Sequence, residues 1–103
     1  MMETAVYNHL KHLGFELFHW QNKARLEVDI LLQTSSGLLP IEVRYGKNVS
    51  KDDVKGLLAC MNELGSGVGI IVTSERMGLE DIGGKQVHYI PAWMFLMCEE
   101  FSV

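Results

Sequence analysis

The sequence has few of the residues that mark disulfide-bonded, secreted or membrane proteins. Its only two cysteines, Cys60 and Cys98, form no CxxC pair, which is typical of buried, reduced thiols in a cytosolic protein. No run reaches the roughly 18 uncharged apolar residues of a membrane span. Residues 1–4 lack the basic and apolar regions of a secretory signal. We therefore predict a cytoplasmic protein that does not enter a membrane.

Positive charge is also scarce. Nine Lys and Arg stand against 13 Asp and Glu, and the formal net charge of −4 disfavours a general nucleic-acid binder. Residues 1–51 hold six basic and five acidic residues, whereas residues 52–103 hold three and eight. Any binding to DNA or another polyanion is therefore expected to be weak and to involve the first half of the chain.

The apolar residues that are present predict one folded α/β domain over residues 1–103. The length and the 48% hydrophobic content suffice for a core. Residues 75–85 carry glycines and are expected to form an irregular connection. The remaining spacing predicts a mixed sheet flanked by helices. The expected helices are residues 2–13, 51–64 and a short one after Pro91, and the expected strands are residues 15–21, 26–33, 38–45, 68–73 and 86–90.

Two local signals mark helix starts. Ser50 and Asp53 have the spacing of a capping box, with Asp in place of the usual Glu. Pro91 suits the first turn of a terminal helix that runs through Trp93, Phe95 and Leu96. That helix is apolar on every side, as buried helices normally are. In a chain this small, part of it is expected to cover a partner.

The second and third expected strands carry acids within apolar runs. Side chains alternate along a strand, so Glu42 shares a face with Arg44. The strands are joined by a hairpin, so Asp29 is expected to lie beside Glu42. The same alternation predicts that Glu27, Asp29 and Leu31 share one face of their strand and that Val28, Ile30 and Leu32 share the other.

Such a pair of carboxylates requires a cation. At about 4.5 Å the two charges repel by roughly 4 kcal/mol at an effective dielectric constant of 20. A hard divalent ion such as Mg²⁺ or Mn²⁺ prefers oxygen ligands and would offset the repulsion. Arg44, on the same face, is the alternative counter-ion, and the cluster would then be a structural network of ion pairs.

Several blocks of the sequence carry a resemblance to known proteins. They are Glu3, His-Trp at 19–20, Glu-Val-Asp-Ile at 27–30, Leu-Leu-Pro-Ile-Glu-Val-Arg-Tyr at 38–45, Gly-Ile-Ile-Val-Thr at 69–73 and Ile-Pro-Ala-Trp at 90–93. Together they resemble the PD-(D/E)xK nuclease superfamily, whose restriction-endonuclease-like core has the order αβββαβ. The closer similarity is to the C-terminal domain of unknown function carried by many archaeal and bacterial AAA+-type ATPases. It covers nearly the whole chain.

The resemblance implies a metal site. Asp29 and Glu42 would bind Mg²⁺ or Mn²⁺, and the backbone carbonyl of Val43 would be a third ligand. Glu3 would orient water or complete the metal shell. The departure is Arg44, which stands where the family has its catalytic lysine. Arginine keeps its charge and cannot act as a base, so Arg44 either stabilises phosphate charge or neutralises the carboxylates and displaces the metal.

Two functions remain open at this point. The first is metal-dependent hydrolysis of phosphodiesters, impaired by Arg44. The second is a non-catalytic binding or docking module of an ATPase, of which this chain would be a C-terminal fragment. Lys47 is a candidate to replace the missing lysine, although an exposed loop lysine is its more ordinary interpretation. The expected partner of the terminal helix is the ATPase module or a second copy in a homodimer.

Overall fold

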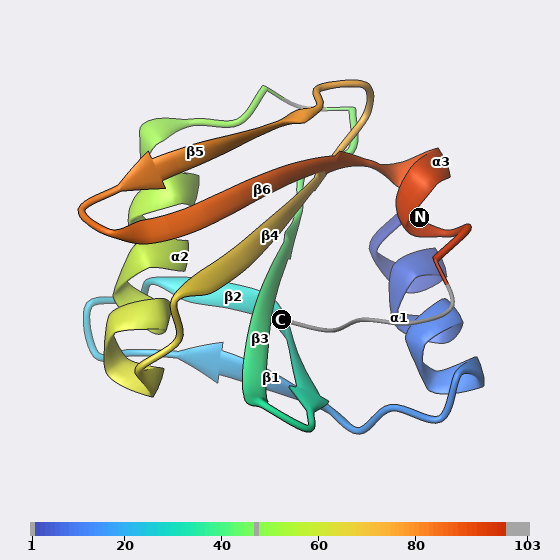
Figure 1. The fold of residues 1–103 in the computed structure, drawn as a ribbon, viewed down its shortest axis with the longest axis horizontal. Coiled ribbons are helices and arrows are strands. Elements are labelled where there is room, and N and C mark those ends of the chain that lie inside the picture. The colour runs from blue at the N-terminus through green and yellow to red at the C-terminus, as the bar shows by residue number, and fades with distance from the viewer. Residues whose placement is uncertain (1, 47, 99–103) are drawn as a thin grey trace.

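The computed structural model describes residues 2–46 and 48–98. These residues form a six-stranded mixed sheet with helices on both faces (Figure 1). The elements follow the order α1 (Met2–His12), β1 (Leu17–Gln21), β2 (Glu27–Thr34), β3 (Gly37–Val43), α2 (Lys51–Leu64), β4 (Val68–Thr73), β5 (Gly78–Ile82), β6 (Lys85–Pro91) and α3 (Ala92–Phe95).

The strands lie in the order β1-β2-β3-β4-β6-β5. Successive hairpins make β1, β2 and β3 antiparallel. The α2 crossover then makes β4 parallel to β3, and β6 is parallel to β4. The last hairpin adds β5 antiparallel to the outer side of β6. The mixed α/β sheet flanked by helices that the sequence predicts is therefore confirmed. No described helix has the length and apolar character needed to cross a membrane.

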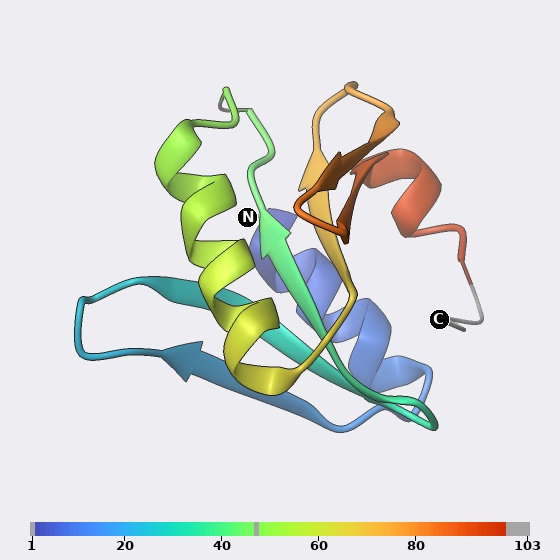
Figure 2. The ribbon, with the colours of Figure 1, turned by 60° about the vertical axis from the view of Figure 1, so that its left-hand side comes forward.

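Each face of the sheet has its own hydrophobic core, and Figure 2 shows α1 and α2 on opposite sides. Helices α1 and α3 cover one face, where the fully buried Leu10 and Phe95 pack. Helix α2 covers the other face with Leu57 and Met61. Close approach of α2 to β4 depends on Gly69, because a Cβ there would lie 2.8 Å from the Met61 sulfur.

Helix α2 begins and ends as its sequence predicts. The Ser50 side chain accepts a hydrogen bond from the Asp53 amide at 3.2 Å, and the Asp53 carboxylate accepts one from the Ser50 amide at 2.8 Å. The capping box is therefore confirmed. Gly65 ends the helix at φ 68°, a left-handed conformation that glycine adopts without a steric penalty.

The expectation of an irregular connection over residues 75–85 is wrong, because this segment contains strand β5. Four of its five residues are exposed, among them Leu79 at 57%. A strand with so little burial needs no alternation of apolar residues, and its bounding glycines resemble loop signals. The terminal helix is also shorter than expected, since Pro91 ends β6 and Leu96 caps α3.

Strand β2 contains a bulge that overturns the expected alternation. Trp20 pairs with Val28 and Phe18 with Leu31, so His19 alone faces both Asp29 and Ile30. One extra residue reverses the faces on either side of it. Val28 therefore packs on the α2 side of the sheet, whereas Ile30 and Leu32 pack on the α1 side. The prediction that these three residues share a face is wrong at Val28, and the bulge lies at Asp29.

Candidate functional site

The guanidinium of Arg44 lies at the centre of a group of carboxyls. Its Nε donates a hydrogen bond to Asp53 at 2.6 Å. Its Nη1 lies 3.6 Å from the Asp29 carboxylate, and its Nη2 lies 3.4 Å from the Glu42 carboxylate. The Arg44 side chain is 25% exposed, and the three carboxyl side chains are more deeply buried. One cation thus serves three acidic side chains from β2, β3 and α2.

Asp29 links the two strands and the first helix. Its Oδ2 accepts a hydrogen bond from the Val43 amide at 2.9 Å. Glu3, at the start of α1, is close enough to form a side-chain hydrogen bond with Asp29, which raises the Glu3 pKa. Burial would raise the pKa of Asp29, but hydrogen bonds from Glu42, Val43 and Glu3 outweigh it and hold this pKa below its usual value.

Glu42 is the most unusual member of the cluster. It is 1% exposed, and its Oε1 has no hydrogen-bond partner among the described residues. It lies on the α2 side of the sheet, because it pairs with Ile71, which packs there. Burial, followed by the adjacent Asp29, raises the Glu42 pKa to about 9. The nearby Arg44 opposes this shift without cancelling it, so Glu42 is protonated at neutral pH.

Because Glu42 is protonated, the cluster carries less excess negative charge. Burial raises the pKa of Asp53, but hydrogen bonds from Ser50 and Arg44 outweigh it, and Asp53 stays ionised. Desolvation lowers the pKa of Arg44, but Asp53 and Glu42 outweigh it, and the arginine stays charged. The cluster therefore holds the ionised Asp29 and Asp53, the Arg44 cation and a neutral Glu42.

A metal ion does not fit this arrangement of side chains. Arg44 Nη1 donates a hydrogen bond to the Val43 carbonyl at 2.8 Å. The same guanidinium contacts Asp29 and Glu42. One arginine therefore contacts all three groups that the family resemblance implies as metal ligands. Among the described residues, no group of three or more His, Cys, Asp and Glu side chains is placed to hold a metal.

The structure brings together the predicted site residues Glu3, Asp29, Glu42 and Arg44. Asp53 is a further member of this site that the sequence did not indicate. The sequence identified Asp53 as a capping residue, and the same carboxylate also binds Arg44. The sequence shows only that the capping box follows Arg44 by a few residues, and the contact itself requires the approach of α2 to the end of β3. Lys47, the candidate replacement for the catalytic lysine, lies outside the described residues.

The C-terminal helix exposes part of its apolar surface. Phe95 is fully buried, whereas Trp93 is 59% exposed and Met97, just after the helix, is 73% exposed. The His9 ring contacts the Cys98 carbonyl at 2.8 Å and ties this segment to α1. Cys98 is only partly buried, in contrast to the expected buried thiol, while Cys60 is fully buried. A partner for this surface stays a prediction.

The fold and the cluster define a mixed α/β domain with an arginine-centred carboxyl site. Comparison with known families gives a more specific assignment. The model of the family described as "Domain of unknown function (DUF4143)" matches residues 1–95. The chain therefore belongs to the DUF4143 family. A search of curated proteins found no match.

Proposed function

We propose that this domain is a non-catalytic binding module with a restriction-endonuclease-like fold, in which Arg44 takes the place of a metal ion. The main support for the proposal is that the Arg44 guanidinium contacts Asp29, Glu42 and the Val43 carbonyl at the same time. A permanent cation held by these groups offsets part of the negative charge that would attract Mg²⁺ or Mn²⁺ and contacts the oxygens that would bind it.

The order of elements supports the fold part of this proposal. Helix α1, strands β1 to β3, helix α2 and strand β4 follow one another as in the αβββαβ core of the PD-(D/E)xK superfamily. The bulge at Asp29 adds support, since bulges are common beside active sites, where they redirect a side chain. We propose that the site architecture persists while its cation has been exchanged.

The binding part of the proposal rests on the surface. Trp93 and Met97 are large apolar side chains that are more than half exposed near the C-terminal end of the described chain. Exposed apolar surface of this kind is typical of protein contacts. An ATPase module is the partner that the family resemblance suggests, and a second copy is the alternative.

An impaired nuclease is the second candidate function. The proximity of Glu3 to Asp29 and Glu42 favours a nuclease, because these are the acids that the nuclease motif requires. Activity would then depend on displacement of Arg44 from the cluster by Mg²⁺ or Mn²⁺. The two candidates differ in whether the native chain binds such an ion.

Titration of Mn²⁺ into the native chain, followed by isothermal calorimetry, separates these candidates. We expect no binding heat from the native chain and measurable binding by Arg44→Lys, because the compact charge of lysine cannot contact all three groups at once and so frees oxygen ligands. Asp29→Ala combined with Arg44→Lys is the control and should lose the binding again. Heat from the native chain, together with plasmid cleavage that Asp29→Ala abolishes, would overturn the non-catalytic proposal.

A further inference from the structure

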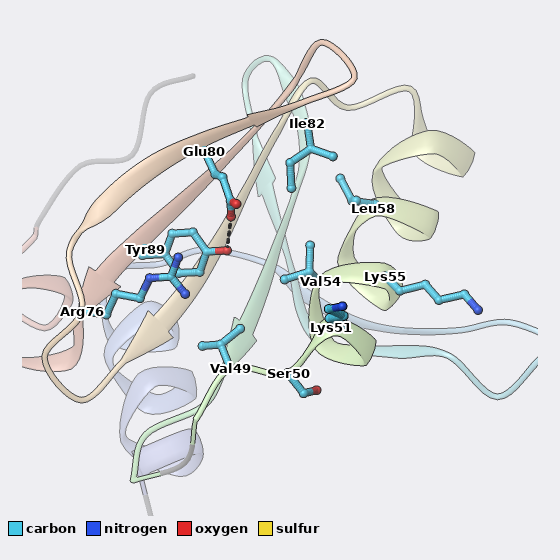
Figure 3. A pocket seen from close by; sticks show the side chains of 10 residues that line it. All are labelled: Val49, Ser50, Lys51, Val54, Lys55, Leu58, Arg76, Glu80, Ile82 and Tyr89. Carbon is cyan, nitrogen blue, oxygen red and sulfur yellow. Dashed lines mark hydrogen bonds between the residues drawn. The ribbon is translucent and has the colours of Figure 1, made fainter.

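A groove separate from the carboxyl cluster lies between the first half of α2 and the β5–β6 hairpin (Figure 3). Its main pocket has a volume of about 420 Å³, within the usual range for ligand sites. A second pocket of about 460 Å³ shares Val49 and Arg76 with the first, so the two adjoin each other. None of the carboxyl-cluster residues lines either pocket. Two adjoining pockets leave room for an extended occupant that spans both.

One wall of the main pocket is a single face of α2. Lys51, Val54, Lys55 and Leu58 have the spacing that places side chains on one side of a helix. Val54 and Leu58 are partly buried, and both lysines are exposed. In Figure 3 the Lys55 side chain extends away from the other side chains that line the pocket. This wall therefore offers apolar surface inside and positive charge at the edge.

The opposite wall comes from the β5–β6 hairpin. The Tyr89 ring is buried under the Arg76 guanidinium, which lies 3.7 Å from the ring centroid. The Tyr89 hydroxyl donates a hydrogen bond to Glu80 at 2.6 Å. Ile82 adds apolar surface to the same wall. The Glu80 carboxylate is thus held by the tyrosine, and Arg76 lines the groove while it stacks on the same ring.

The charge of the main pocket is opposite to that of the whole chain. Three cations, Lys51, Lys55 and Arg76, line it with one carboxylate, Glu80. Within the described part of the chain, none of these cations takes part in an ion pair. The formal net charge of the chain is −4. A locally positive groove on an acidic protein favours an occupant with negative charge.

The apolar interior decides what kind of anion fits. A phosphodiester backbone has no apolar surface that could pack against the apolar lining residues of the pocket, which are Val49, Val54, Leu58 and Ile82. Nucleic acid is bound chiefly through contacts of basic side chains with phosphates, and three cations supply few of those. A peptide that carries an apolar side chain between acidic ones matches both the interior and the edge.

We propose that this groove binds an extended, acidic segment of a partner protein. An apolar side chain of that segment enters the main pocket between α2 and Ile82. Flanking Asp or Glu side chains meet Lys51, Lys55 and Arg76 at the edge. This inference rests on the proposed binding function and specifies the chemical nature of the partner.

The test is selection of a phage-displayed random peptide library against the full chain. Enriched peptides should carry Leu, Ile or Phe flanked by Asp or Glu. Their affinity, measured by fluorescence anisotropy, should fall about tenfold or more in Lys51→Glu combined with Lys55→Glu. The matched control, Lys11→Glu with Lys23→Glu, makes the same change in net charge on exposed residues outside the groove and should leave the affinity within about twofold.

Several outcomes would overturn the proposal. These are the absence of enriched peptides, enrichment of basic or purely apolar peptides, or an equal loss in the groove and control variants. A duplex oligonucleotide that binds through Lys51 and Lys55 would make the groove a phosphate site instead. Sedimentation that shows a dimer broken by the groove variant would assign the groove to a second copy. Each of these results leaves the Mn²⁺ calorimetry unchanged, so the two proposals fail separately.

Discussion

Replacement of Arg44 by methionine should destabilise the fold strongly at neutral pH. Methionine keeps most of the apolar stem but removes the charge and every hydrogen bond of the guanidinium. The ionised Asp29 and Asp53 would remain partly buried without their cation. The Val43 carbonyl would lose its 2.8 Å hydrogen bond from the same group.

The magnitude follows from the burial of the cluster. Removal of one partner from a buried ion pair costs roughly 3–5 kcal/mol, whereas exposed pairs contribute about 0–1 kcal/mol. The Arg44 side chain is 25% exposed and its carboxyl partners less so, which places the expected loss at about 2–4 kcal/mol. In a domain of this size, such a loss lowers the Tm by at least roughly 8 °C.

Urea unfolding followed by circular dichroism measures this loss, with Lys11→Met as the control for removal of one positive charge. The control should change stability by less than about 0.5 kcal/mol. The pKa values of Asp29 and Asp53 lie below 3.8 in the folded chain, so their stabilisation is present above that pH and is lost as the pH falls. The loss in free energy of unfolding caused by Arg44→Met should therefore be smaller at acidic pH. A loss below about 1 kcal/mol at pH 7, or one that grows in acid, would refute the role of Arg44 as internal counter-ion.

Three further changes test separate parts of the account. Glu42 holds a proton in the folded chain between pH 4.5 and about 9, so stability should fall as the pH rises through that window, and Glu42→Gln should remove this slope in a pH series of urea unfolding curves. Gly69→Ala should cost about 1–3 kcal/mol in thermal unfolding, because the new Cβ would lie 2.8 Å from the Met61 sulfur and 3.1 Å from Leu57. Ser50→Ala should cost about 1 kcal/mol by loss of the helix cap, and an unchanged Tm would contradict the capping box.

The sequence predicts those elements whose signals are local or strongly periodic. The capping box at Ser50 and the glycine at position 65 identify both ends of α2, because each satisfies backbone groups of its own helix. The apolar run at residues 68–73 identifies β4, which is covered on both faces. The sequence also predicts that the acids of β2 and β3 lie close together, because strands joined by a hairpin are neighbours in the sheet.

What the sequence does not predict depends on partners distant in the chain. The bulge at Asp29 comes from pairing with β1, and no local pattern signals an extra residue in an apolar strand. Strand β5 forms because β6 offers a free edge, even though its own residues are mostly exposed. The second role of Asp53, as the closest carboxylate to Arg44, requires the approach of α2 to the end of β3.

The most direct test of the central claim is anomalous diffraction from crystals of the native chain soaked in Mn²⁺. We expect no anomalous peak among Asp29, Glu42 and the Val43 carbonyl, and we expect the Arg44 guanidinium to contact all three groups. A manganese peak bound by these groups, with Arg44 turned away, would contradict that claim.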